Sequence, residues 1–160
     1  MSLLPLFILS PLLMAVVWSD MRYMRIPNWF SLSTVGFFLI IAIVFQPSDL
    51  WLRILVAGSV FGIGFAGFCF NLWGGGDVKF LSALMLFIPV TTLSVFGYVF
   101  SAALLLGIVL ILGLRRVPAL AGQHWKAISG STKFPMGLSI GMAGLAHPLV
   151  VMLLGVPLPG

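Results

Sequence analysis

The stretch from Leu93 to Leu114, LSVFGYVFSAALLLGIVLILGL, contains 22 residues and no charged side chain. A transmembrane helix needs about 20 predominantly apolar residues to cross the hydrocarbon core of a bilayer. The whole chain has a similar character, because hydrophobic residues make up 61% of it and charged residues only 7%. Soluble domains contain about 45–50% and about 25%, respectively. The composition therefore predicts an all-α, polytopic membrane protein.

Six apolar runs divide the chain, and this stretch is the fifth of them. The runs are Leu3–Trp18, Trp29–Phe45, Leu50–Leu72, Val78–Val90, Leu93–Leu114 and Phe134–Leu154. Pro89 and the pair Thr91-Thr92 indicate a turn after the fourth run, because one helix over Val78–Leu114 would far exceed the membrane thickness. The first and fourth runs are short, so each is expected to borrow flanking residues or to tilt. We predict a single domain over residues 1–160, a bundle of six transmembrane helices.

The lysines and arginines are distributed unevenly between the two sides of this bundle. If the loops alternate across the membrane, only Arg53 falls on one side, and the others fall on the opposite side: Arg22, Arg25, Lys79, Arg115, Arg116, Lys126 and Lys133. The positive-inside rule makes this second side cytoplasmic and places both termini outside. The cytoplasmic loops are then Met21–Asn28, Trp73–Gly76 and Val117–Lys133, the last a loop or a surface helix with Trp125 at the interface. The net charge of +5 indicates contact with anionic lipid. Nucleic-acid binding is the weaker explanation, because no loop carries a dense run of basic residues.

Two of the three acidic residues lie where a carboxylate is costly. Asp20 and Asp77 stand at the edges of apolar runs, both at the predicted cytoplasmic edge, and Asp77 closes the run Gly74-Gly75-Gly76-Asp77. Each aspartate could simply be a boundary residue, with Asp77 as a helix N-cap. However, intramembrane acids are functional candidates, and consecutive glycines leave backbone that another chain can approach closely. We interpret the pair as the acid and base of a proteolytic site, beside a substrate groove formed by the glycines.

Three segments carry a resemblance to a known family. The sequence SDMRYMRIPN, Ser19–Asn28, resembles the first aspartate motif of type IV prepilin peptidases, in which an Asp precedes Ile-Pro-Asn. GGGDVK, Gly74–Lys79, is similar to the Gly-x-Gly-Asp motif of that family, including the lysine. Phe134-Pro135-Met136-Gly137 resembles its proline-containing entry to the last helix. Order and spacing agree over essentially the whole chain.

The resemblance implies a membrane aspartyl endopeptidase that cuts the leader of a prepilin after a Gly, at the cytoplasmic face of the bacterial inner membrane. It makes Asp20 and Asp77 catalytic, and it implies supporting or groove roles for Gly74, Gly75, Gly76, Lys79, Pro27, Asn28 and Pro135. The implied partners are a prepilin, with a basic leader and an apolar helix, and the lipid bilayer. Neither a cofactor nor a metal is implied, and the oligomeric state stays open.

Larger members of the family carry a cytoplasmic domain with paired Cys-x-x-Cys motifs, which is associated with N-methylation of the pilin. This sequence has one cysteine, Cys69, so it resembles the small, single-domain form of Flp-type (tight adherence) pilus systems, and methyltransferase activity is not implied. In the expected mechanism Asp20 and Asp77 share one proton. The helix dipole favours Asp77 as the base, although Arg22 and Arg25 could reverse the assignment.

Other residues have simpler interpretations. Asp49 falls in a short external turn, where aspartate is common, and we expect Asp49→Asn to be nearly silent. His147 is expected to be a packed, neutral histidine without a visible partner. Lys79 either tunes Asp77 or anchors the helix at the membrane surface. The pairs Gly58/Gly62 and Gly137/Gly141 have the small-xxx-small spacing of closely packed helices.

Two other functions compete with a peptidase. One is a non-enzymatic membrane assembly subunit, in which both aspartates only cap helices. The other is a small proton-coupled transporter, for which paired acids at mid-membrane or an inverted repeat would be expected.

Overall fold

The computed structural model describes residues 3–117, 125–129 and 134–157. Their regular elements are all helical: α1 (Leu4–Tyr23), α2 (Asn28–Phe45), α3 (Leu50–Cys69), α4 (Gly75–Met85), the 3-10 turn η1 (Val90–Thr92), α5 (Leu93–Arg115), α6 (Lys126–Ser129) and α7 (Met136–Leu154). No strand occurs in this part of the chain. The all-α class is therefore confirmed.

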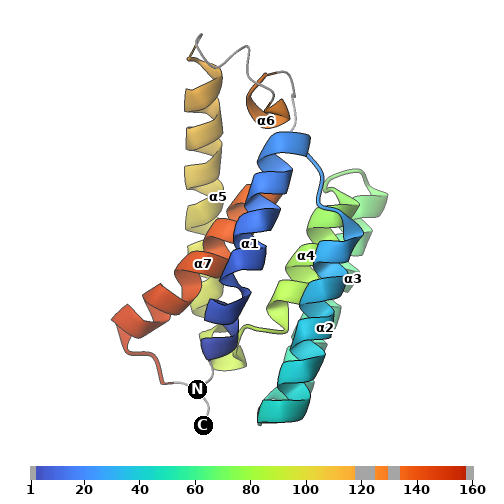
Figure 1. Ribbon diagram of the computed structural model, residues 1–160, viewed down its shortest axis with the longest axis vertical. Helices are drawn as coiled ribbons and strands as arrows, with labels where there is room; N and C mark the ends of the chain where they lie inside the picture. The colour runs from blue at the N-terminus through green and yellow to red at the C-terminus, as the bar shows by residue number, and fades with distance from the viewer. Residues whose placement is uncertain (1–2, 118–124, 130–133, 158–160) are drawn as a thin grey trace.

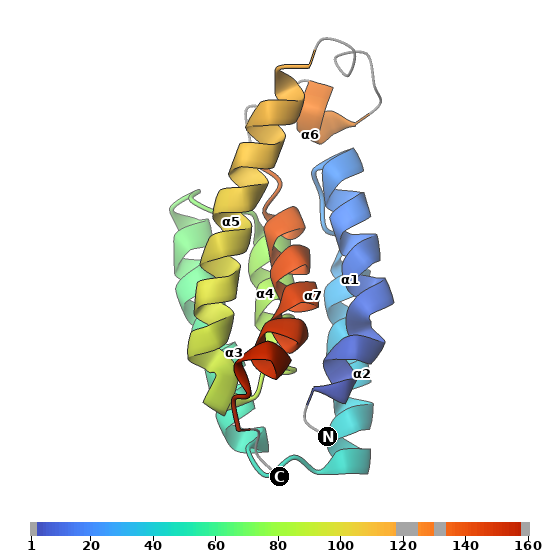
Figure 2. The same cartoon turned by 90° about the vertical axis from the view of Figure 1, so that its left-hand side faces the viewer.

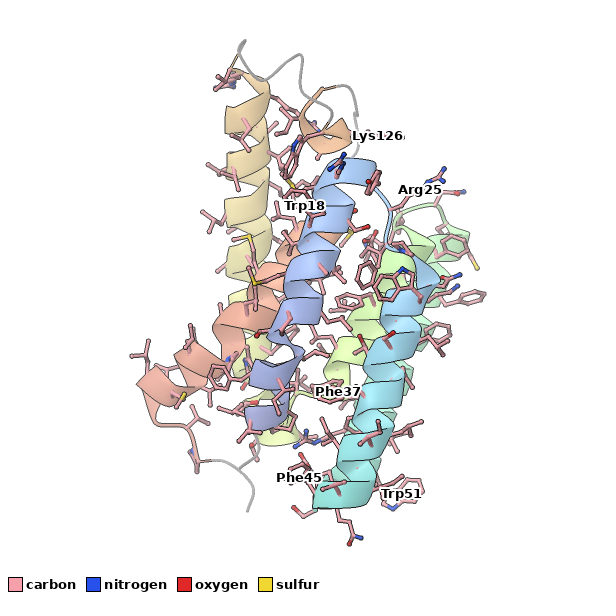
Figure 3. The ribbon with its side chains drawn as sticks, in the orientation of Figure 1. Trp18, Arg25, Phe37, Phe45, Trp51 and Lys126 are labelled. Carbon is pink, nitrogen blue, oxygen red and sulfur yellow. The ribbon has the colours of Figure 1, made fainter. Side chains whose placement is uncertain are left out.

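The long helices stand side by side and alternate in direction (Figure 1). α1, α3 and α5 run one way, whereas α2, α4 and α7 run the other way, so α1 begins and α7 ends at the same end of the bundle (Figure 2). The connections α1–α2, α3–α4 and α5–α7 share the opposite end, which we call the loop end. Arg25 and Lys126 lie at the loop end, and Phe45 and Trp51 lie at the other (Figure 3). The predicted cytoplasmic loops thus begin and end on one side, although residues 118–124 and 130–133 lie outside the described ranges.

Five segments are long and apolar enough to cross a membrane: Leu4–Tyr23, Asn28–Phe45, Leu50–Cys69, Val90–Arg115 and Met136–Leu154. The predicted fourth crossing, Val78–Val90, differs, because α4 has only 11 residues and ends at Met85. Pro89 disfavours helical backbone at the residue before it, and the chain passes through turns to η1. The count of six full spans is therefore not confirmed, even though α4 runs inside the bundle.

α4 nevertheless contributes to the packed core. Phe80 and Leu84 are fully buried, and they belong to a core cluster with Leu13 of α1 and Ile140 of α7. α3 and α2 pack against α4 from one side, while α7 packs against both α1 and α5. The outward faces of the long helices carry exposed apolar side chains such as those of Leu32, Trp51, Tyr98 and Leu153. This pattern suits helices that face lipid.

Only one of the two predicted small-residue pairs packs against another helix. A Cβ atom added at Gly137 or Gly141 would collide with side chains of α1, so α7 and α1 approach closely there. At Gly58 and Gly62 no atom lies within 4 Å of an added Cβ. The prediction of close packing is thus confirmed for Gly137 and Gly141, and it is wrong for Gly58 and Gly62 within the described chain.

The far end of α4 is held by a buried ion pair that the sequence interpretation missed. Arg53 Nε donates to Asp49 Oδ1 at 2.8 Å, and the two side chains are only 5% and 11% exposed. Arg53 Nη1 also donates to the carbonyl oxygens of Leu86 and Phe87 (3.4 and 3.3 Å), and Asp49 Oδ2 accepts from Val90 N at 3.2 Å. Asp49 does precede α3 in a turn, but its interpretation as an ordinary turn former is wrong.

His147 packs as expected, but it has a partner. The residue is fully buried, its Nε2 lies 3.1 Å from Thr92 Oγ1, and its ring meets the edge of Phe96 at a centroid distance of 5.5 Å. Because Thr92 Oγ1 donates to Pro89 O at 3.0 Å, it accepts from His147 Nε2. The histidine therefore ties α7 to η1, at the end of the bundle opposite to the loop end.

Candidate active site

Asp20 lies in the last turn of α1, and local hydrogen bonds fix where that helix ends. Met24 has left-handed backbone (φ 55°), and its N–H donates to Asp20 O at 2.8 Å. Ser19 Oγ donates to Arg25 O at 3.1 Å, which secures the turn that follows. The side chain of Asp20 is directed inward and is only 4% exposed. A carboxylate in such a position needs compensation from the groups around it.

The compensation comes from the start of α7. The backbone N–H groups of Gly137 and Leu138 interact with the carboxylate of Asp20, as expected where an anion meets the N-terminus of a helix. An added Cβ at Gly137 would lie 2.8 Å from Asp20 Oδ2 and 2.9 Å from Asp20 Cβ, so only glycine leaves room. Oδ2 itself is buried without a hydrogen-bond partner among the described residues. The sequence interpretation gave the helix dipole to Asp77 alone, but Asp20 also meets a helix N-terminus, that of α7.

Asp77 lies in the first turn of α4. The N-cap residue is Gly74, with extended backbone (φ −75°, ψ 136°), so Asp77 is the third helical residue and not the N-cap considered above. Its carboxylate interacts with the backbone N–H of Gly74, in the manner of the acidic member of a capping box. The pKa of Asp77 is raised from 3.8 to about 7, mainly by burial and also by the charge of Asp20, while the hydrogen bond from Gly74 acts to lower it.

The two aspartates, from α1 and α4, therefore lie close enough to interact electrostatically. Ile26, from the α1–α2 connection, is the residue around which α4 and α7 converge. Its carbonyl oxygen lies 3.0 Å from an added Cβ at Gly76, and its Cδ1 lies 2.8 Å from one at Gly137. Neither Ile26 nor the amides of Gly137 and Leu138 were predicted as site residues, although Ile26 and Gly137 lie within the quoted motifs.

The glycine run is shaped by contacts inside the protein. Gly75 and Gly76 open α4, and none of the three glycines has a positive φ. An added Cβ at Gly74 would lie 2.5 Å from Asp77 Oδ2, whereas one at Gly75 would meet only the ring of Phe68 at 3.3 Å. The outer two glycines thus make room for the carboxylate of Asp77 and for the backbone of Ile26, and the middle one is the least constrained.

A small apolar cavity adjoins Asp77. It measures about 280 Å³ and is walled by α3, α4, α5 and α7, including Gly64, Trp73, Phe100, Met136 and Ile140. The ring of Trp73 closes one side, because it lies directly over Gly67 of α3. Asp77 is the one ionisable residue among those that line it.

The remaining predicted supporting residues are Pro135, Pro27, Lys79 and Asn28. Pro135 is buried and immediately precedes α7, next to the amides that face Asp20. Pro27 precedes α2 on the exposed side of the turn. Lys79 and Asn28 contact one another, with Lys79 Nζ donating to Asn28 Oδ1 at 3.2 Å. Lys79 therefore points towards α2. This contact supports the interpretation of Lys79 as an anchor of the helix at the membrane surface, and not the one in which it tunes Asp77.

Comparison with known proteins bears on this arrangement. The family model of type IV leader peptidases matches residues 7–113, a range that includes both aspartates and ends before α7. No curated protein and no solved structure matches the chain. The match covers well over half of the sequence and indicates a peptidase that acts on leader peptides. The helices that are long enough to cross a membrane are consistent with a membrane protein. The chain belongs to the type IV leader peptidase family.

Proposed function

We propose that this protein is an aspartyl endopeptidase of the bacterial inner membrane, which cuts the basic leader from Flp-type prepilins after a Gly. The observation that supports this most strongly is the meeting of Asp20 and Asp77. Two carboxylates from different helices interact, and one of them keeps a buried oxygen without a hydrogen-bond partner in the described chain. A structural carboxylate would normally be satisfied on both oxygens, so the bare oxygen favours a role in binding water or substrate.

The proposed mechanism needs one proton shared by the pair. With a pKa of about 7, Asp77 holds a proton for a large part of the time at neutral pH and can donate it to the carbonyl oxygen. Asp77 recovers this proton when the carbonyl re-forms, while the proton that the other aspartate takes from water passes to the leaving amine. The amides of α7 stabilise the anionic form of Asp20, so Asp20 takes the proton from the attacking water. This assignment reverses the one based on the sequence, in which the dipole of the helix that carries each residue favoured Asp77 as the base.

The position of the site suits the proposed substrate. If the loop end is cytoplasmic, as the cations indicate, the apolar helix of a prepilin can stay in the bilayer while its leader reaches both aspartates. The small cavity beside Asp77 would then accept an apolar side chain near the scissile bond, since its wall is almost entirely apolar.

Cleavage of a prepilin by the purified protein tests the proposal. Asp20→Asn and Asp77→Asn should each abolish cleavage, because an amide cannot transfer the proton, while both variants still insert and unfold cooperatively. A prepilin whose last leader Gly is replaced by a bulky residue should resist the wild-type enzyme. Ser48→Ala, at an exposed position at the opposite end of the bundle, serves as a control that leaves both carboxylates and the buried ion pair in place. Substantial cleavage by either Asp20→Asn or Asp77→Asn would contradict the mechanism and favour a non-enzymatic assembly subunit.

A further inference from the structure

A second and larger cavity opens on the other side of α4 from the site. It measures about 810 Å³ and lies between α2, α3 and α4, within the range of about 300–1,000 Å³ that is typical of ligand cavities. Neither Asp20 nor Asp77 is among the residues that line it. We call it the α2–α4 groove, and its occupant is a separate question from the cleavage reaction.

The polar residues of the groove gather at the loop end. Asn28 is the first residue of α2, and Lys79 lies in the second turn of α4. A hydrogen bond of 3.2 Å from Lys79 Nζ to Asn28 Oδ1 joins them. An ammonium group has three donors, and this bond uses one of them. One turn further along α2, Ser31 Oγ is buried without a partner among the described residues. Trp29, half exposed and stacked on Phe30, stands at the rim.

The rest of the groove is apolar and open. Leu32 and Val35 of α2 face Ile54 and Ala57 of α3 across it. Gly58 keeps it deep, because no atom lies within 4 Å of the Cβ that another residue would place there. The groove therefore has a cationic, hydrogen-bonding end at the membrane surface and a long apolar part that extends towards the membrane centre.

We propose that the α2–α4 groove binds an anionic phospholipid of the cytoplasmic leaflet. A phosphate oxygen accepts from Lys79 Nζ, and an acyl chain lies along Gly58 and Leu32. Charge complementarity decides between this occupant and the apolar helix of a prepilin. A basic leader brought to the same end would be repelled by Lys79, whereas the phosphate of a lipid is attracted by it.

The binding can be measured on the full chain in neutral detergent, as the rise in thermal midpoint on adding phosphatidylglycerol or phosphatidylcholine with identical acyl chains. Ligands that bind only the folded state raise the midpoint. We expect phosphatidylglycerol to raise it by about 3 °C more than phosphatidylcholine does. Lys79→Gln should remove the difference between the two lipids, and Gly58→Leu should remove the response to phosphatidylglycerol.

Matched variants make the test specific. Gly97→Leu alters a glycine of α5 that is equally open, and Lys126→Gln removes an exposed charge at the loop end, so both should respond like wild type. If Gly58→Leu does not unfold cooperatively, Leu32→Trp fills the groove from an exposed position and should lose the response. Equal shifts with the two lipids, or an equal loss in a control variant, would overturn the proposal. It would also fail if a peptide of the prepilin apolar helix stabilises wild type and Lys79→Gln alike but not Gly58→Leu.

Discussion

The carboxylate of Asp77 has the raised pKa that a proton donor at neutral pH requires, and the same property makes the stability of the protein depend on pH. The folded state binds the Asp77 proton with a pKa of about 7, against 3.8 for an unperturbed aspartate. Because the folded value is the higher one, the associated stability is present below about pH 4 and is lost as the pH rises through about 7.

We therefore expect the thermal midpoint of wild type to fall between pH 5 and pH 8 relative to that of Asp77→Asn, which has no proton to lose at this position. The measurement is the midpoint of both proteins in the same detergent over this range. Parallel curves would show that Asp77 does not titrate there, and the proposed proton donor would lose its basis.

Single added methyl groups distinguish the roles of the glycines. Gly74→Ala would press on the end of the Asp77 side chain, and Gly76→Ala on the backbone of Ile26. We expect Gly74→Ala to reduce single-turnover cleavage with little change in thermal midpoint, and Gly76→Ala to reduce both. Gly75→Ala should be mild, because only the ring of Phe68 must move. The valine series should lose cleavage more steeply, and activity that merely tracks the midpoint across the variants would assign all three glycines a structural role.

At the scale of helices, the most informative element is α4, which is too short to cross a membrane and is held at both ends. At its start, Gly74 and Asp77 form a cap-like contact. Beyond its end, the carbonyls of Leu86 and Phe87 accept from Arg53. Carbonyl groups that lack helical partners need such donors inside a membrane. α4 can therefore stop early and still carry Asp77 at a fixed height.

This arrangement predicts that Asp49→Asn is strongly destabilising, contrary to the expectation from its turn position. Removing one partner from a buried ion pair costs about 3–5 kcal/mol, because the other charge remains uncompensated. The thermal midpoint should fall by several degrees, whereas Ser48→Ala, at the exposed neighbouring position, should leave it unchanged. Similar midpoints for the two variants would mean that the pair contributes little.

The sequence predicted the elements unevenly, and each error has a physical reason. Hydropathy identifies apolar runs but does not report where a helix stops, so the fourth run was assigned a full span although its helix, α4, ends at Met85. Asp49 and Arg53 have the spacing of a pair on one helical turn, and that signal was available. The carbonyls that complete their network lie more than 30 residues away in the chain, and no local pattern indicates them.

At the scale of the whole molecule, alternating helices and uneven cations agree on one polar end. The contacts that assemble the site there were not predictable in detail, because Gly137 meets Asp20 only through the packing of α7 on α1. The two aspartates themselves were proposed from the sequence, since carboxylates are so rare in this chain.

The orientation in the membrane is the prediction at this scale. We expect cytoplasmic exposure of the connections after α1, α3 and α5, with Met1 and Gly160 outside, because the cations gather at the loop end. Single cysteines introduced in a background without Cys69 can be labelled from either side with a membrane-impermeant reagent. Labelling of a cysteine at Gly160 from the cytoplasm would mean a different orientation or an odd number of crossings.

The amides that face Asp20 belong to α7, the last of the described helices to emerge from the ribosome. A nascent chain that has inserted α1 to α5 already holds both aspartates, but it has no donor at Gly137 or Leu138 for the first of them. The candidate site is therefore completed only after α7 has been made and has packed against α1. A chain that stops before α7 would carry the acidic pair without these donors, and in the proposed mechanism it would not cleave a leader peptide.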